Sequence, residues 1–141
     1  MKKIVTFILI LQTISAGLSF ACSCTPKSVQ EYFTQADIVF TGEVLELSKE
    51  GEYGLKATLK PLKLYKGMYN KILTVMTIDR TKAPGLCGYS FAKNEKVLVY
   101  GNGNVNTDAF STDICRGTKS LSDAQEDLKE LEKGFEVLKD K

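Results

Sequence analysis

Apolar and polar residues alternate along much of the chain, which is the two-residue period of a β-strand. The most strand-like run covers residues 72–78 and is rich in β-branched side chains. Further strands are predicted on the same grounds over residues 36–47, 55–65, 96–101 and 108–114. Gly42 marks a bulge in the first of these, and Pro61 marks an edge or a kink in the second. Short polar turns separate the runs, so the sequence predicts five or six strands.

Two segments have helical features instead. Ser28 and Glu31 form a capping box that predicts a short helix ending at about Gln35. Near the C-terminus, apolar residues recur at helical spacing, at Leu121, Ala124, Leu128, Leu131, Phe135 and Leu138. We expect an amphipathic helix there, with Ser122 and Gln125 as its capping box. A mainly β chain with a helix at each end predicts a small, partly open β-barrel of the OB type.

The first 21 residues have the features of a secretory signal peptide. Two lysines precede an uncharged apolar stretch that is shorter than the roughly 20 residues needed to span a bilayer. Small residues, Ser19 and Ala21, define a cleavage site directly before Cys22. We therefore expect a signal peptide at residues 1–21 and one domain at residues 22–141, secreted to the extracellular space or the periplasm.

The alternative is a lipoprotein signal, in which Cys22 would be acylated and would anchor the protein to a membrane. Such signals place a branched aliphatic residue three positions before the cysteine, and this chain has Ser19 there. The sequence therefore favours simple cleavage over lipidation.

Charge and composition exclude several classes of function. The chain has 19 Lys plus Arg and 17 Asp plus Glu, and two of the lysines lie in the leader, so the expected domain is neutral. Neutrality gives no reason to propose nucleic acid or an anionic membrane as a partner. The chain has no His, which removes the usual general base of hydrolases and the commonest zinc ligand. We therefore expect a protein that is not an enzyme and needs no cofactor.

Four cysteines, Cys22, Cys24, Cys87 and Cys115, lie in the expected domain. In a chain that leaves the cytosol they predict two disulfides, and three pairings are possible. Cys22 and Cys24 are too close in sequence to bond easily to each other. One alternative is a four-thiolate zinc site, but the C-x2-C pairs typical of such sites are absent. Another is a thiol exchange enzyme, but only Lys27 supplies nearby positive charge.

Four segments of the sequence resemble a known family. They read CSCTP at 22–26, ADIVFTGEV at 36–44, LCGYSF at 86–91 and SLSDAQEDL at 120–128. Together they resemble the inhibitory domain of the tissue inhibitors of metalloproteinases, which has a netrin-like OB fold. The resemblance implies disulfides between Cys22 and Cys87 and between Cys24 and Cys115.

The chain departs from that family in two respects. Thr34 stands where the family has a cysteine of a third disulfide, and the sequence ends soon after the expected helix, without the second domain. Because the leader is bacterial in style, we expect a bacterial, single-domain relative.

What the resemblance implies is a monomeric inhibitor that binds a zinc metalloprotease through Cys22. The α-amine and carbonyl oxygen of Cys22 would chelate the zinc of the partner protease, at the position where such enzymes keep a water. Ser23 would enter the specificity pocket, and Cys24, Thr25 and Pro26 would lie along the cleft, with Gly85 and Leu86 beside them. The alternative is an extracellular protein-binding module on the same scaffold that does not inhibit.

Overall fold

The computed structural model describes residues 22–69, 71–104 and 106–139, with side chains up to Gly134. The expected signal peptide and the side chains of Phe135 and Leu138 therefore lie outside the described residues.

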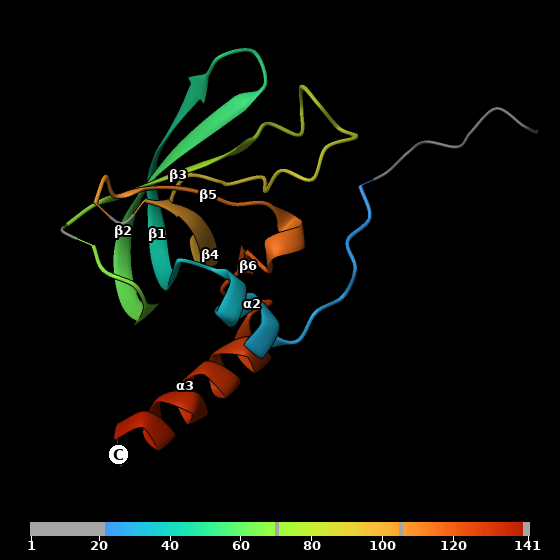
Figure 1. Cartoon of the computed structure of the whole chain (residues 1–141). Coiled ribbons are helices and arrows are strands. Elements are labelled where there is room, and N and C mark those ends of the chain that lie inside the picture. The colour runs from blue at the N-terminus through green and yellow to red at the C-terminus, as the bar shows by residue number, and fades with distance from the viewer. Residues whose placement is uncertain (1–21, 70, 105, 140–141) are drawn as a thin grey trace, which may run out of the picture.

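Six strands form one sheet that closes on itself (Figure 1). They are β1 (Ile38–Glu50), β2 (Gly54–Lys66), β3 (Leu73–Ile78), β4 (Lys96–Asn104), β5 (Ala109–Ser111) and β6 (Lys119–Ser120). The order is β1-β2-β3-β5-β4-β6, and pairing of β1 with β4 closes the first five strands into a barrel. All pairs are antiparallel except β3 with β5. The predicted OB-type barrel of five or six strands is confirmed.

The long hairpin of β1 and β2 contains the two irregularities that the sequence predicts. Its register shifts between Thr41 and Gly42, so Gly42 lies at a bulge. A Cβ atom added to Gly42 would lie 2.9 Å from the ring of Phe40, which explains the need for glycine. Pro61 lies opposite Gly42, beyond the point where the pairing of β2 with β3 ends at Leu59. Among the described strands Pro61 has no partner on that side, and such a strand edge is where proline is tolerated in a sheet.

The short helix α2 (Val29–Gln35) begins at the predicted capping box. The backbone N–H of Glu31 donates to the Ser28 hydroxyl at 3.3 Å, and the backbone N–H of Ser28 donates to the Glu31 carboxylate at 2.7 Å. These bonds satisfy two donors that the first turn of a helix otherwise leaves free.

The C-terminal helix α3 (Gln125–Lys139) is present, but its predicted capping box is wrong. Before the helix begins at Gln125, the backbone N–H of Asp123 donates to the Ser120 hydroxyl at 3.2 Å. The Gln125 side chain donates instead to the carbonyl of Leu121 at 2.7 Å. A tight turn at residues 121–124 separates β6, which ends at Ser120, from the helix.

The last predicted strand is also partly wrong. Only Ala109–Ser111 pairs as β5, and Ile114–Arg116 forms a short 3-10 helix, η2, which ends at Gly117 with φ of 95°. After β5, the backbone N–H of Thr112 donates to the carbonyl of Met76 at 2.9 Å, and its buried hydroxyl donates to the carbonyl of Tyr100 at 2.8 Å. Cys115 therefore lies on η2 rather than at the end of a strand.

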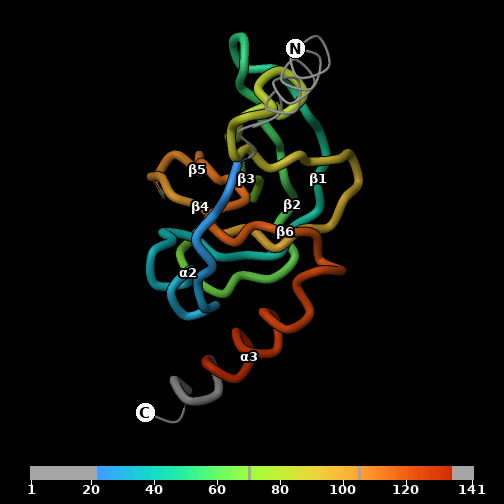
Figure 2. Tube along the Cα trace, turned by 90° about the vertical axis from the view of Figure 1, so that its right-hand side faces the viewer, coloured from blue at the N-terminus to red at the C-terminus, as the bar shows by residue number. Residues whose placement is uncertain are grey.

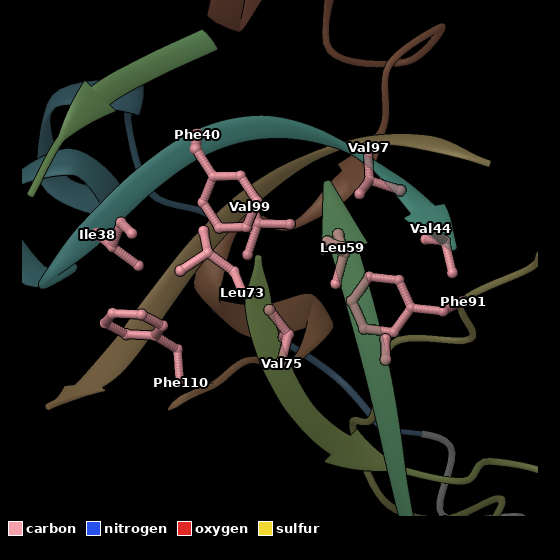
Figure 3. Close-up of a cluster of buried hydrophobic side chains, with 11 residues drawn as sticks. Ile38, Phe40, Val44, Leu59, Leu73, Val75, Phe91, Val97, Val99 and Phe110 are labelled. Carbon is pink, nitrogen blue, oxygen red and sulfur yellow. The ribbon is translucent and has the colours of Figure 1, made fainter. Parts of the chain in front are cut away.

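Alternate residues of the strands face two different apolar clusters, as the pleat of a strand requires. The cluster inside the barrel includes Ile38 and Phe40 of β1 and Val97 and Val99 of β4, all fully buried (Figure 3). The remaining members are Val44, Ala57, Leu59, Leu73, Val75, Phe91 and Phe110.

The second cluster lies on the outer face of the barrel, between the strands and the two helices. Its buried members are Ala36, Val39, Tyr65, Leu98, Tyr100, Ala124 and Leu131. The helices α2 and α3 thus pack on one wall of the barrel (Figures 1 and 2). None of the helices in the described part of the chain is both long and apolar enough to cross a membrane.

Candidate functional site

The N-terminal segment, residues 22–28, has no regular secondary structure and runs along the outside of the barrel. Figure 2 shows it in blue, passing from α2 toward the yellow connection between β3 and β4. Two disulfides hold it, Cys22 to Cys87 with a Cα–Cα distance of 5.3 Å and Cys24 to Cys115 with one of 5.0 Å. These are the pairs that the family resemblance implies, and no cysteine of the described residues is free.

Burial alternates along the N-terminal segment. Cys22 and Cys24 are half-buried, whereas Ser23, Thr25 and Pro26 are exposed. The cysteine side chains are bonded to the barrel, so the segment presents the residues between and after them to solvent. An extended strip of backbone, fixed at two points and open on one side, is suited to lie in a cleft of another protein.

The Cys87 loop, residues 79–91, has an ordered turn at its start. The Asp79 carboxylate accepts hydrogen bonds from the backbone N–H of Thr81 at 2.9 Å and from its hydroxyl at 2.6 Å. These bonds, led by the hydroxyl, lower the pKa of Asp79. The turn continues with Ala83 donating to the Asp79 carbonyl and Leu86 donating to the Ala83 carbonyl, each at 3.0 Å. The exposed residues Gly85 and Leu86 therefore stand on a turn with defined geometry.

The end of the same loop is fixed against β3. A Cβ atom at Gly88 would overlap the carbonyl oxygen of Ile78, so only glycine allows this approach. The backbone N–H of Tyr89 donates to the Thr77 hydroxyl at 2.8 Å. These contacts hold the backbone that directly follows Cys87.

One backbone hydrogen bond joins the two disulfide anchors. The N–H of Ile114, in η2, donates to the carbonyl of Cys87 at 2.9 Å. Cys87 and Cys115 therefore belong to adjacent pieces of backbone, and the two disulfides act on the N-terminal segment as one support.

The far end of the N-terminal segment is anchored to α2. The Lys27 ammonium donates to the Gln35 side chain at 2.7 Å, and Ser28 and Glu31 form the capping box. The bonds from Ser28, first from its backbone N–H and then from its hydroxyl, lower the pKa of Glu31. The segment is thus held by disulfides at its beginning and by a helix cap at its end.

The seven residues that the sequence predicts for protease binding lie in two segments, the N-terminal segment and the Cys87 loop, which the disulfide between Cys22 and Cys87 joins. Tyr53, at the tip of the β1–β2 hairpin, also contacts the Cys87 loop. The carbonyl of Tyr53 accepts a hydrogen bond from the backbone N–H of Asp79 at 2.7 Å, and the residue is 49% exposed. The D-x-T pattern at Asp79 is a signal for a turn, but no sequence signal connects it with Tyr53.

The four cysteine sulfurs converge on one place. All of them lie within 4.8 Å of one another, and the sulfurs of Cys22 and Cys115, which belong to different disulfides, are 3.9 Å apart. In this structure they are paired as disulfides, and a disulfide sulfur is not a thiolate ligand.

A polar hollow of about 430 Å³ lies beside this sulfur cluster. Its lining residues are Lys27, Tyr32, Gln35, Ala36, Tyr100, Asn102, Asp113, Cys115 and Arg116. The Arg116 guanidinium is paired with Asp113 at 2.9 Å. The hollow lies where the N-terminal segment, α2 and η2 meet, and the sequence carried no signal for it.

A small OB-type barrel whose extended N-terminus is bonded to its flank defines a netrin-like module. A model of the family described as tissue inhibitor of metalloproteinase matches residues 20–130. The chain belongs to this family.

Two curated relatives are similar to this chain. Metalloproteinase inhibitor 3 of Scyliorhinus torazame is 36% identical over 88 residues, which is 60% of this chain and 41% of that protein. Metalloproteinase inhibitor 3 of Xenopus laevis is 34% identical over 99 residues, which is 67% of this chain and 45% of that protein. The chain thus spans less than half the length of these relatives.

Proposed function

We propose that this protein is a secreted inhibitor of zinc metalloproteases whose mature form begins at Cys22. Membership of the family and the names of its relatives support an inhibitory role. The observation that carries the proposal is the N-terminal segment, which is fixed by two disulfides while Ser23, Thr25 and Pro26 stay exposed.

The chemistry rests on the main chain of Cys22. A catalytic zinc has three protein ligands and an open position for water. Once the signal peptide is removed, the α-amine and the carbonyl oxygen of Cys22 can displace that water and close a five-membered chelate ring. The amine must be uncharged to donate its lone pair, and an ordinary α-amine has a pKa of about 7.7 to 8.0, so the neutral form is accessible near neutral pH. The Cys22 sulfur is in the disulfide and is not the ligand.

The residues around Cys22 would set the remaining contacts. In this proposal Ser23 enters the specificity pocket, and Cys24, Thr25 and Pro26 lie along the cleft as a substrate would. Gly85 and Leu86, next to the bonded Cys87, extend the same surface. Because the segment is already ordered, binding loses less conformational entropy than binding of a free peptide.

The inhibitor acts by occupying another protein's site, so it needs no catalytic residue and no cofactor of its own. It works as a monomer in the extracellular space or the periplasm, after cleavage between Ala21 and Cys22.

A one-residue extension tests the proposal. The protein that begins at Cys22 is compared with a matched protein that carries one alanine before Cys22, on a panel of zinc metalloproteases. The extension removes the free amine from Cys22, so we expect inhibition to weaken by about 100-fold or more, which corresponds to about 3 kcal/mol. Intact mass with and without reduction shows whether both proteins carry two disulfides, and their thermal unfolding midpoints should agree.

Two results would contradict the proposal. Equal inhibition by the extended protein would show that the amine of Cys22 is not the ligand. Absence of inhibition by either protein, together with binding to a protease or another extracellular protein, would favour the non-inhibitory binding module. The intact mass of the exported protein gives a separate check, because a diacylglycerol on Cys22 would exclude a free amine.

A further inference from the structure

We propose that Gln35, the last residue of α2, is a positioning residue for the N-terminal segment in protease binding. The inference rests on the proposed function, and it adds a residue to the seven that the sequence predicts for protease binding. Gln35 acts through Lys27, whose ammonium donates to the side-chain oxygen of Gln35 at 2.7 Å.

The disulfides hold the N-terminal segment only as far as Cys24. The next anchor is the capping box of α2, which begins at Ser28. Residues 25–27 lie between these two anchors, and all three are exposed. Among the hydrogen bonds of the described residues, the one from Lys27 to Gln35 is the only one that these three residues make. This bond therefore fixes the course of the chain between the two anchors.

Gln35 is itself held in place by its main chain. Its carbonyl accepts a hydrogen bond from the side-chain amide of Asn102, on β4, at 2.7 Å. Two residues further on, the backbone N–H of Asp37 donates to the carbonyl of Gly101, also on β4, at 2.9 Å. The backbone of Gln35 is thus fixed to the sheet, so its side chain offers Lys27 an acceptor that extends from a fixed point.

The support of Gln35 continues to η2. The Arg116 guanidinium donates to the side-chain oxygen of Asn102, and this bond orients the amide of Asn102 toward Gln35. Arg116 lies in η2 next to Cys115, which is the disulfide partner of Cys24. Both ends of the exposed stretch are therefore tied to the same 3-10 helix, one by a covalent bond and the other by a chain of hydrogen bonds.

The size of the effect follows from the kind of bond. Lys27 and Gln35 are both exposed, so a hydrogen bond between their side chains contributes modestly. Without it, residues 25–27 sample more conformations, and binding in a cleft has to order them again. We therefore expect loss of the Gln35 acceptor to weaken inhibition by about three- to tenfold without changing the stability of the barrel.

Gln35→Ala removes the acceptor, and Gln30→Ala is the matched control. Gln30 is an exposed glutamine of the same helix, and its side chain makes no hydrogen bond to the described residues. Inhibition constants of both variants are measured against the same zinc metalloprotease, together with their urea unfolding midpoints. We expect Gln35→Ala to inhibit about three- to tenfold more weakly than Gln30→Ala, at equal midpoints.

Rescue separates positioning from a purely structural role. Gln35→Glu keeps an oxygen acceptor for Lys27 and should inhibit within about twofold of the unmodified protein. Lys27→Met should weaken inhibition, and adding Gln35→Ala to it should weaken inhibition no further, because both changes remove the same bond. Equal inhibition by Gln35→Ala and Gln30→Ala, a Gln35→Glu protein as weak as Gln35→Ala, or full additivity of the two changes would each overturn the proposal.

A second measurement does not depend on inhibition. Backbone amide relaxation in NMR reports the fast motion of Thr25 and Lys27. We expect a lower heteronuclear NOE at both amides in Gln35→Ala than in Gln30→Ala. If the unmodified protein inhibits no metalloprotease, the proposed function fails, and this comparison alone decides whether Gln35 orders the segment. Unchanged NOE values would refute the ordering itself.

Discussion

Each disulfide can be removed on its own by two serine substitutions, and the two removals should affect stability alike but inhibition differently. The first variant carries Cys22→Ser with Cys87→Ser, and the second carries Cys24→Ser with Cys115→Ser. Both keep the free α-amine of residue 22, because serine has the same main chain as cysteine.

The expected stability losses follow from the lengths of the closed loops. The sequence separations are 65 residues for Cys22–Cys87 and 91 residues for Cys24–Cys115. In the chain-entropy model these loops stabilise the fold by at most about 4.3 and 4.6 kcal/mol. The two values are close because the entropy of loop closure grows only with the logarithm of loop length. The two variants should therefore differ in unfolding free energy by only about 0.3 kcal/mol.

The expected losses of inhibition differ because the two bonds hold different residues. Without the Cys22–Cys87 bond, Cys22 and Ser23 are free up to Cys24, and ordering two residues costs about 2 to 4 kcal/mol on binding. That cost weakens inhibition by about 30- to 1000-fold. Without the Cys24–Cys115 bond, the segment is still held at Cys22 and at Lys27, so we expect a loss of about tenfold or less.

The assay combines urea unfolding with inhibition constants for a zinc metalloprotease, at a temperature where circular dichroism shows both variants folded. The reasoning is refuted if both variants lose inhibition to the same extent, since stability would then decide the outcome. It is also refuted if the Cys24–Cys115 variant is the weaker inhibitor.

Two further substitutions test the packing that supports the site. Gly88→Ala should lower the unfolding free energy by more than 1 kcal/mol and weaken inhibition, because the added methyl group overlaps a carbonyl of β3. Gly134→Ala is the control, since nothing lies within 4 Å of an added Cβ there. That change should stabilise α3, because alanine favours helix more than glycine does. Equal stability of the two variants in urea would contradict this account. Tyr100→Phe removes the hydroxyl that donates to the buried Asp127 at 3.3 Å, and it should lower the unfolding free energy by about 1.5 to 3 kcal/mol, measured by thermal or urea unfolding. Tyr53→Phe is the control at a half-exposed residue, and it should change the unfolding free energy by less than about 0.5 kcal/mol.

Local patterns in the sequence predicted most of the barrel. The alternation along β1 separates Phe40, inside the barrel, from Val39, which faces the helices. Gly42 and Pro61 lie opposite each other in the hairpin. Gly42 lies at a bulge, and Pro61 lies where β2 is no longer paired with β3. These features follow from the backbone chemistry of single residues, so they could be read without knowledge of the fold.

Features that depend on distant contacts could not be read in this way. The sequence predicts a strand up to Cys115, but β5 ends at Ser111, the buried Thr112 bonds to Tyr100, and Cys115 lies in η2. The predicted capping box at Ser122 does not form because a tight turn at residues 121–124 lies between β6 and the start of α3 at Gln125. The place of Tyr53 beside the Cys87 loop depends on the pairing of β2 with β3, because the hydrogen bond from Asp79 to Tyr53 comes directly after the pair Gly54 and Ile78.

The candidate site was predictable to a similar degree. The C-x-C motif located the N-terminal segment, and the family resemblance supplied the partners of its two cysteines. The convergence of all four sulfurs, with a polar hollow beside them, follows only from the closed barrel, which brings η2 next to the Cys87 loop.

The link between Cys24 and Cys115 spans 91 residues, and this fixes an order of events during synthesis on the ribosome. The N-terminal cysteines leave the exit tunnel first, whereas their partners follow only after most of the barrel has been translated. The surface formed by the N-terminal segment is therefore among the last parts of the molecule to be completed. A truncated product that stops before η2 would display Cys24 as an unpaired thiol, which a quality-control system for thiols could recognise.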